Sequence, residues 1–242
     1  MKSGIDIETH VLALDNTSLN YWRLCPKKFW YRIQNDLVQA HDDMPFGEEP
    51  KKPLELHYGT AWHAGMDELY KNRNLPAAQD AFAEAAKDLA DDKYNKRTIG
   101  RGIKDLATYW DLYKYDLNQW ELVHAEAHCG GVLTKIVHDD ITWTVWYHGA
   151  IDKILRHKES GKIRVRDHKT TTYINQYTGE LYMLSNQLMG YSWLVRDFFG
   201  YDDNDKLSVD ADIVGLTKVA DSTFLRPEIH TTSELTDEWR EE

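Results

Sequence analysis

The chain has 242 residues, which is long enough for one domain with a substantial hydrophobic core. Its formal net charge of −11 argues against a protein that coats nucleic acid non-specifically, because that kind of binding depends on Lys and Arg side chains. No apolar run approaches the ~20 residues of a membrane helix, and the N-terminus lacks the apolar core of a signal peptide, so we expect a soluble protein of the cytoplasm.

The first half of the chain is expected to be mainly helical. A helix capped by Thr17 or Ser18 should run to about Asn35, with an interruption where Pro26 can open a second helix. Closely spaced prolines predict a loop over residues 41–57. Three further helices are expected, over residues 59–73, 76–92 and 99–117.

From Trp120 onward the sequence changes to runs rich in Val, Ile, Thr, Trp and Tyr, which are typical of strands. Strands are expected over residues 120–128, 131–137, 142–155, 162–168, 211–219 and 224–231. A helix is expected over residues 180–199. Its apolar stripe should consist of Leu181, Leu184, Leu188, Tyr191 and Val195.

This order of elements predicts an α/β fold. Helices, an antiparallel meander, a further helix and further strands describe a central mixed sheet that is flanked by helices. We find no internal repeat and no linker, so residues 1–242 are expected to form a single domain. Residues 1–118 would form its mainly helical part, and residues 119–242 would form its sheet-containing core.

Two of the predicted strands form a hairpin that brings two carboxylates together. The hairpin turns at residues 158–161, and pairing about its centre sets Asp152 opposite Asp167. Like charges in this position destabilise a sheet unless a cation lies between them. Alternation puts Lys169 on the face of Asp167, where an ammonium could assist attack on a phosphate. The alternative is an ordinary surface hairpin that ends in a Lys–Asp pair.

Charge is distributed unevenly along the chain. Residues 153–169 carry seven Lys or Arg side chains, and a basic strip that includes Arg164 and Arg166 could contact phosphate. Acidic residues crowd segments that we expect to be solvated faces, over residues 36–49, 202–212 and 234–242.

A separate pattern lies in the first predicted strands. His124, Glu126 and His128 alternate onto one strand face, and this spacing could hold zinc. No fourth ligand is evident in the sequence. A polar strand, or one that faces an active site, is therefore the preferred interpretation.

Five segments in a fixed order carry a resemblance to a known family. The segments are Tyr21–Phe29, Gly59–His63, Gly149–Asp152, Asp167–Thr170 and Gln187–Tyr191. Together they resemble the RecB-type branch of the PD-(D/E)XK nucleases, which includes AddB-like nuclease domains, CRISPR spacer-acquisition nucleases and phage exonucleases. The resemblance spans about residues 18–191. It implies a restriction-endonuclease-like core and a deoxyribonuclease, with an exonuclease preferred, that acts in DNA recombination, repair or phage DNA metabolism.

The resemblance also implies a metal site. His63, Asp152 and Asp167 match the side chains that hold one or two Mg(II) or Mn(II) ions, and the backbone carbonyl of His168 is a further oxygen ligand. Lys169 matches the catalytic lysine that assists the attack of water.

Three other residues take roles by the same resemblance. Gln187 and Tyr191, four apart on one helical face, match a motif that leans over the active site and contacts DNA or water. Tyr191 also belongs to the predicted apolar stripe. Glu126 resembles a strand glutamate that often precedes the hairpin, and it is a weaker candidate than the others.

Contacts with DNA are expected near the N-terminal helices. Lys27, Lys28 and Arg32 could meet phosphate of a single strand or of a duplex end. Neighbouring aromatic side chains could stack on bases, or could simply be core residues; they are Tyr21, Trp22, Phe29, Trp30 and Tyr31. No phosphate-binding loop of the G-x-x-x-x-G-K-[ST] type occurs, so no nucleotide is expected. If unwinding is needed, a helicase or recombination partner must supply it.

Two alternative functions remain open. One is a DNA-binding subunit of a recombination or repair complex that cuts little. The other is an iron-sulfur nuclease, which would need three cysteines after residue 191. Here the two cysteines are Cys25 and Cys129, so no cluster is expected unless the missing cysteines lie outside this chain, and both are expected to be buried free thiols.

Overall fold

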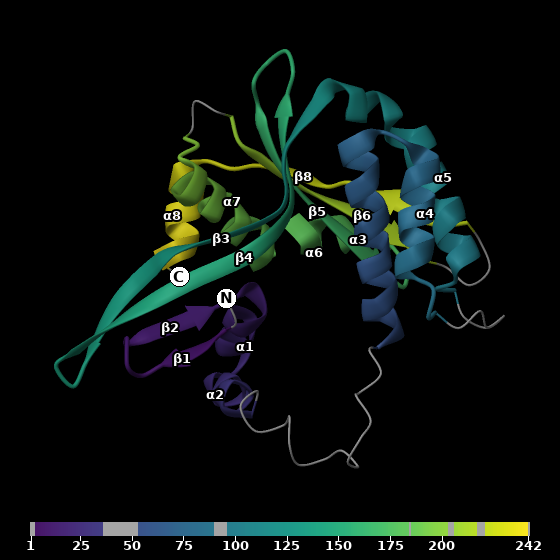
Figure 1. Cartoon of the computed structure of the whole chain (residues 1–242). Helices are drawn as coiled ribbons and strands as arrows, with labels where there is room; N and C mark the ends of the chain where they lie inside the picture. Colours follow the sequence, from purple (N-terminus) through teal and green to yellow (C-terminus); the bar gives the residue numbers. More distant parts are fainter. Residues whose placement is uncertain are drawn as a thin grey trace, which may run out of the picture.

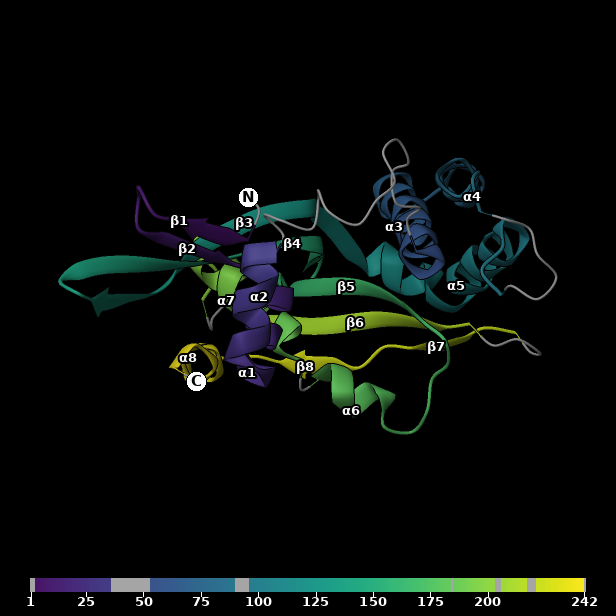
Figure 2. The ribbon, with the colours of Figure 1, turned by 90° about the horizontal axis from the view of Figure 1, so that it is seen from below.

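The molecule has a mixed central sheet with helices packed against both faces (Figures 1 and 2). The computed structural model describes six ranges of the chain: residues 3–35, 53–89, 96–183, 185–202, 206–216 and 221–241. Within these ranges the sheet contains eight strands, some paired parallel and others antiparallel. The predicted α/β class, with a mixed sheet flanked by helices, is therefore confirmed.

Two short strands and two helices open the described chain. They are β1 (Gly4–Asp6), β2 (Val11–Leu14), α1 (Asn16–Leu24) and α2 (Pro26–Asn35). The predicted break before Pro26 is confirmed. The predicted cap at Thr17 or Ser18 is wrong, because Asp15 caps α1 by accepting the backbone N–H of Ser18 at 2.7 Å. The two strands were not predicted, so the mainly helical half also contributes to the sheet.

Three helices form a layer on one face of the sheet. They are α3 (Leu54–Asn72), α4 (Leu75–Ala85) and α5 (Ile99–Gln119). Helix α3 begins directly after Pro53, so residues 54–57 are helical, in contrast to the predicted loop. The predicted loop residues 41–52 lie outside the described part of the chain. Helix α4 ends before the predicted boundary at residue 92, and residues 90–95 also lie outside the described ranges.

The meander consists of three antiparallel strands: β3 (Trp120–His138), β4 (Ile141–His157) and β5 (Ile163–Thr171). The two strands predicted over residues 120–137 are one strand, because Gly130 and Gly131 stay paired with β4. Lys153 pairs with Arg166, which is the predicted register of the hairpin. The strands β3 and β4 form a long arm that extends beyond the other elements (Figure 1).

The helix predicted over residues 180–199 is two helices, α6 (Thr178–Met183) and α7 (Asn186–Phe199). Ser185 caps α7 by accepting the N–H of Leu188, which separates the two helices. Leu181 is 68% exposed and therefore lies outside the apolar stripe, whereas Leu188, Tyr191 and Val195 are buried as predicted. Leu184 lies outside the described residues.

Three more strands and a helix complete the described chain. They are β6 (Ser208–Gly215), β7 (Thr223–Leu225), β8 (Glu228–His230) and α8 (Ser233–Glu241). Strand β6 runs parallel to β5, and its residues are buried throughout. The strand predicted over residues 224–231 is two short strands, because Pro227 between them has no N–H to donate to a ladder. Helix α8 was not predicted.

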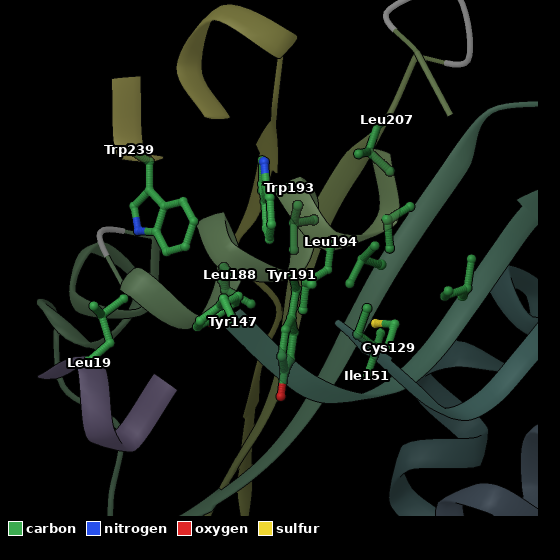
Figure 3. Packing of buried hydrophobic residues seen from close by; sticks show 14 of the residues in the cluster. Leu19, Cys129, Tyr147, Ile151, Leu188, Tyr191, Trp193, Leu194, Leu207 and Trp239 are labelled. Atoms are coloured by element: carbon green, nitrogen blue, oxygen red, sulfur yellow. The ribbon is translucent and has the colours of Figure 1, made fainter. Parts of the chain in front are cut away.

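Side chains of the sheet alternate between two hydrophobic clusters. Val165 and Ile213 pack in a cluster with α1, α7 and α8, whereas Leu155 and Val214 pack in a cluster with α3, α4 and α5. Figure 3 shows part of the first cluster, including Tyr191. Both faces of the sheet are therefore covered.

One edge of β4 changes partner along its length. On one side, β4 pairs with β3 along its length. On the opposite side, residues 144–147 of β4 pair parallel with β2, and residues 153–156 pair antiparallel with β5. No described strand pairs with residues 148–152 on this edge. The sheet therefore opens between β2 and β5, and the predicted site residues gather at this opening.

Candidate metal centre

Asp152 lies at the open edge of β4, and Asp167 lies beside it in β5. Oδ2 of Asp152 accepts the backbone N–H of His168 at 2.7 Å, which links the strands just beyond the Lys153–Arg166 pair that ends their ladder. The side chain of Asp152 is 14% exposed and that of Asp167 is 2% exposed. Two carboxylates are thus held together with little access to water.

The surroundings of the two carboxylates shift their pKa values in opposite directions. Burial is the largest influence on both and favours the neutral acid. For Asp152, the hydrogen bond and charge of His63 outweigh burial and lower the pKa. For Asp167, burial together with the negative charge of Asp152 outweighs the neighbouring ammonium of Lys169 and raises the pKa. A divalent cation beside Asp167 would reduce the cost of its negative charge.

His63 approaches the carboxylates from α3. Its Nδ1 atom lies 3.3 Å from Oδ1 of Asp152. Burial lowers the pKa of His63, but the hydrogen bond and charge of Asp152 outweigh burial, so the pKa of His63 is raised. The structure therefore brings the predicted histidine to the predicted carboxylate from distant parts of the sequence.

A second contact fixes α3 against β4. Lys153 is fully buried, and its Nζ atom donates to Asp67 and, at 3.0 Å, to the carbonyl oxygen of Asp152. Asp67 lies four residues after His63, on the same face of α3. Our sequence interpretation missed this pair. The His-x-x-x-Asp spacing within a predicted helix is the signal that could have identified Asp67.

Lys169 lies against Asp167. Its Nζ atom is 3.0 Å from Oδ1 and 2.8 Å from Oδ2 of Asp167, and its side chain is 28% exposed. Burial opposes the positive charge of Lys169, but the charge of Asp167 outweighs this effect and raises the pKa of Lys169. The ammonium is therefore protonated at neutral pH and accessible from solvent.

Gln187 and Tyr191 reach the site from α7. Nε2 of Gln187 lies 3.4 Å from Oδ1 of Asp167 and donates to the hydroxyl of Tyr191 at 2.8 Å. That hydroxyl donates to the carbonyl oxygen of Ala150 at 2.8 Å. Tyr191 is buried in the core (Figure 3), so the pair connects the carboxylate to the backbone of β4.

The donor atoms at this point suit a divalent cation. Mg(II) and Mn(II) can be coordinated by carboxylate oxygens together with one imidazole nitrogen. Oδ2 of Asp167 is buried and accepts no hydrogen bond from the described residues, although the ammonium of Lys169 is close to it. The backbone of His168 also lies at the site, since its N–H binds Asp152.

The ligands are not assembled around a common point. Among the residues that the structure describes, no group of three or more His, Cys, Asp or Glu side chains is placed to hold a metal ion. His63 and Asp152 contact each other instead, as do Lys169 and Asp167. The residues fit a cation by chemistry and proximity, and its binding would replace these contacts.

Glu126 lies on β3, at the position opposite Asp152 on β4. The ladder pairs Ala125 with Lys153 and Ala127 with Ile151, and Glu126 between them has a φ of 48°. This left-handed backbone is uncommon for a residue other than glycine, and within a strand it marks a local irregularity that the surrounding structure must hold in place. Glu126 is exposed and lines a cavity that also contains His63 and Lys169, next to the carboxylates.

The zinc arrangement considered for this strand is wrong. His124 packs against the ring of Phe199, with the ring centroids 4.8 Å apart. His128 lines one cavity and Glu126 lines another. The left-handed conformation of Glu126 interrupts the alternation on which the zinc arrangement depended.

Two cavities meet at Lys169. One has a volume of about 510 Å³, lies beside α3 and is lined in part by His63, Asp67 and Glu126. The other has a volume of about 620 Å³, lies beside α1 and α7 and includes Gln187 and Tyr191. Lys169 belongs to the lining of both. The candidate centre is therefore accessible from two sides.

The basic strip expected over residues 153–169 is only partly on the surface: Arg156, Lys158 and Lys162 are exposed, whereas the two arginines expected to contact phosphate are not. Arg166 is fully buried, and its guanidinium donates to both carboxylate oxygens of Asp210, at 2.7 and 2.5 Å. The side chain of Arg164 is 12% exposed and contacts Asp210 and Glu228. These arginines are unavailable to phosphate because β6 and β8 supply carboxylates that the local sequence pattern could not reveal.

A buried ionic network lies behind the centre. Arg226 contacts Asp212 and Asp116, and Asp116 also contacts Arg166. The hydroxyl of Tyr109 donates to Asp212. These residues come from α5, β5, β6 and the segment after β7, so the network holds α5 against the sheet. No sequence motif indicated it.

The residues predicted to contact DNA lie in α2. Nζ of Lys27 is 5.9 Å from the ring centroid of Tyr31, and Nζ of Lys28 is 4.8 Å from that of Tyr21. The side chain of Arg32 lies outside the described part of the structure.

The neighbouring aromatic side chains divide between core and surface. Phe29 is buried in the core, and Tyr21 is partly buried. Trp22, Trp30 and Tyr31 are each about half exposed. The purely core interpretation of this cluster is therefore wrong for these three.

The two cysteines have different surroundings. Cys25 is exposed, which contradicts the expectation that both thiols are buried. Cys129 is buried, and burial raises the pKa of its thiol to about 11. In the described ranges, no helix has the length and apolar composition required to span a membrane.

Comparisons with known proteins bear on the family and the fold. A family model described as the PD-(D/E)XK nuclease superfamily matches residues 16–242. No curated protein matches the chain. Among solved structures, one named "Putative exonuclease" from Eubacterium rectale is similar in fold, with a TM-score of 0.50 and 11% sequence identity. The alignment covers 94% of this chain and 75% of that chain.

Proposed function

We propose that this chain, which belongs to the PD-(D/E)XK nuclease superfamily, is a metal-dependent deoxyribonuclease that removes nucleotides from DNA ends. One observation carries the proposal: His63, Asp152, Asp167 and Lys169 come together from α3, β4 and β5 at the open edge of the sheet. The similar fold of a structure named as an exonuclease supports the choice of an exonuclease. In this proposal, residues 1–242 act as one nuclease domain, and the RecB-type branch remains a prediction.

His63, Asp152 and Asp167 would hold Mg(II) or Mn(II), with the backbone carbonyl of His168 as a further oxygen ligand. The bound ion would polarise the scissile phosphate and lower the pKa of water at the site. Asp152 is suited to this role because its lowered pKa keeps it ionised. Glu126 is a weaker candidate for a metal ligand, since it is exposed and lies on the neighbouring strand β3.

Lys169 would act on the reacting groups. Its ammonium can orient the attacking water and stabilise the charge that develops on the phosphate, because it is protonated and accessible from both cavities. Gln187 would be a positioning residue that holds Asp167 through Oδ1. Tyr191 would position Gln187, since its hydroxyl is already bound to Gln187 and Ala150.

DNA would reach the centre with help from the N-terminal helices. Lys27, Lys28 and Arg32 are the proposed phosphate contacts. The exposed ring of Tyr31 lies beside Lys27, and the partly buried ring of Tyr21 lies beside Lys28. The chain lacks a phosphate-binding loop, so a helicase or recombination partner would supply any unwinding.

Digestion of end-labelled linear DNA and of relaxed circular DNA in Mn(II) tests the proposal. An exonuclease releases label from the linear substrate and leaves the circle intact. Asp167→Asn serves as the matched control, because it keeps the side-chain shape and removes the charge. A wild-type protein that cuts neither substrate would favour the rival function, a subunit that binds DNA without cutting it. Cutting of the circle would identify an endonuclease instead.

A further inference from the structure

The cavity beside α1 and α7 contains groups that the proposed hydrolysis does not use. Its volume is about 620 Å³, within the range of sites that bind small organic molecules. Trp146 and Phe198 contribute flat aromatic rings to its lining. Asn16, His128 and His148 contribute groups that can form hydrogen bonds. Lys169 lies in the same wall, so this cavity adjoins the place where the phosphate would react.

The cavity is shaped by glycines on two paired strands. A Cβ atom at Gly130 would lie 2.5 Å from Nε1 of Trp146, so the absence of a side chain lets the indole lie directly against β3. A Cβ atom at Gly149 would lie 2.8 Å from the ring of Tyr191. Neither glycine has a positive φ, so space and not backbone conformation requires glycine here. The wall that holds Trp146 therefore depends on close packing.

Some polar groups of this cavity have unused hydrogen-bonding capacity. Oδ1 of Asn16 is buried and has no hydrogen-bond partner among the described residues. Burial lowers the pKa of His148, so its imidazole is neutral at neutral pH. Its Nε2 atom lies 3.5 Å from Oγ of Ser3, and its Nδ1 atom has no hydrogen-bond partner among the described residues. A ligand with flat faces and hydrogen-bonding edges would fit both the aromatic rings and the polar groups of this cavity.

The charge of the two cavities differs. Glu55, Asp67 and Glu126 line the cavity beside α3. Asp67 is paired with Lys153 and Glu55 with Arg97, so Glu126 is the carboxylate there that would repel a nucleic acid backbone. In the other cavity the acidic lining residue is Asp15, and its carboxylate is engaged as the cap of α1. A polynucleotide at Lys169 is therefore better accommodated on the side of Trp146 and Phe198.

We propose that this cavity binds an unpaired nucleoside adjacent to the scissile phosphate, which makes single-stranded DNA, or a single-stranded end, the substrate. The inference rests on the proposed nuclease function and specifies its substrate. The faces and pairing edges of a base are available to a protein only when the base is unstacked and unpaired. A blunt duplex end would have to open before it could fill the cavity.

Binding in Ca(II) tests the inference without relying on cleavage. The probes are a single-stranded oligonucleotide that carries 2-aminopurine near one end and a blunt duplex of the same sequence. Phe198→Ala is the first variant, because Phe198 is 55% exposed and its removal should leave the fold intact. Trp146→Ala is the second, and Tyr115→Ala is the matched control, since Tyr115 is 74% exposed on α5 and lines neither cavity.

The expected result is tighter binding of the single strand than of the duplex, with quenched 2-aminopurine fluorescence. Phe198→Ala and Trp146→Ala should each weaken single-strand binding by about 5-fold or more, as for the loss of one base–aromatic stack, and Tyr115→Ala should not. Equal binding of both probes, or variants that bind like wild type, would overturn the inference. The wild-type protein could also bind single-stranded DNA more tightly than the two ring variants do and yet cleave no DNA in Mn(II). That result would support the nucleoside-binding cavity and refute the nuclease function.

Discussion

Asp152 accepts the backbone N–H of His168 at 2.7 Å, and this hydrogen bond links β4 to β5 at the end of their ladder. The other carboxylate oxygen of Asp152 faces His63 in α3. One side chain thus connects three elements that meet at the opening of the sheet. The proposed chemistry depends on this connection, because it places an imidazole, two carboxylates and an ammonium within one small volume.

Lys169→Ala should reduce DNA cleavage by about 100-fold or more while leaving the fold and Mn(II) binding nearly unchanged. The reason is that the lysine acts on the reacting groups and does not bind the ion. Single-turnover rates with end-labelled DNA measure the effect, and circular dichroism checks the fold. Lys158→Ala, at an exposed lysine of the hairpin turn, is the control. A Lys169→Ala rate above about a tenth of the wild-type rate would refute the role.

Asp67→Ala should destabilise the protein by about 3 kcal/mol, because it leaves the buried ammonium of Lys153 without its carboxylate partner. Lys153→Met removes the charge and keeps the length of the side chain. The double variant should therefore recover most of the stability lost in Asp67→Ala, as measured by urea denaturation. Additive losses in the double variant would show that the ion pair does not couple α3 to β4.

Asp116→Asn should make the free energy of unfolding less dependent on pH in the acidic range. Burial favours the neutral form of Asp116, but the charges of Arg166 and Arg226 outweigh it, so the folded-state pKa of Asp116 is lowered. The resulting stability is present above the unfolded pKa, near 4, and is lost as pH falls through the lower folded pKa. The variant should be less stable than wild type at pH 7, by about 1 to 3 kcal/mol, and the difference should shrink below pH 4.

A constant difference between Asp116→Asn and wild type from pH 7 to pH 3 would contradict this assignment. Asp111→Asn is the matched control, because Asp111 lies on the same helix with its side chain 74% exposed. It should show little change at either pH. Urea denaturation at each pH provides the free energy of unfolding for all three proteins.

Replacing Lys27 and Lys28 together by Ala should flatten the salt dependence of DNA binding. Each lost phosphate contact lowers the slope of log affinity against log salt concentration by roughly one unit, so two contacts should lower it by about two. Affinities are measured with single-stranded DNA in Ca(II). The control is the double replacement of Lys104 and Lys114, which lie on α5 and contact acidic neighbours. Equal slopes for all three proteins would show that DNA binds elsewhere.

The hairpin at the centre could be predicted from sequence because its signals are local. Strand propensity, a short turn and alternation were enough to give the register in which Lys153 pairs with Arg166, and hence the proximity of Asp152 and Asp167. His63 could be assigned to the site only from the family resemblance, because nothing in the sequence of its own helix indicates that it contacts Asp152. The comparisons confirm the superfamily, whereas the roles of the individual residues remain predictions.

Other features could not be predicted because they depend on distant partners. Arg166 follows the pattern of an exposed strand residue, and only the neighbouring strand reveals that Asp210 pairs with it in the interior. The short strands β1 and β2 have too few residues for a clear period; pairing with β4 stabilises β2, and pairing with β2 stabilises β1. Leu181 has an apolar side chain at a helical spacing, but the cap at Ser185 begins a separate helix after it.

Binding of Mn(II), followed by the loss of its free-ion electron paramagnetic resonance signal, tests the metal centre most directly. Wild type and Lys169→Ala should both bind Mn(II), because Lys169 is not a ligand. Asp167→Asn should bind it far more weakly, since a charged oxygen ligand is lost. Equal Mn(II) binding by wild type and Asp167→Asn, or no binding by wild type, would contradict the assignment of His63, Asp152 and Asp167 as the metal site.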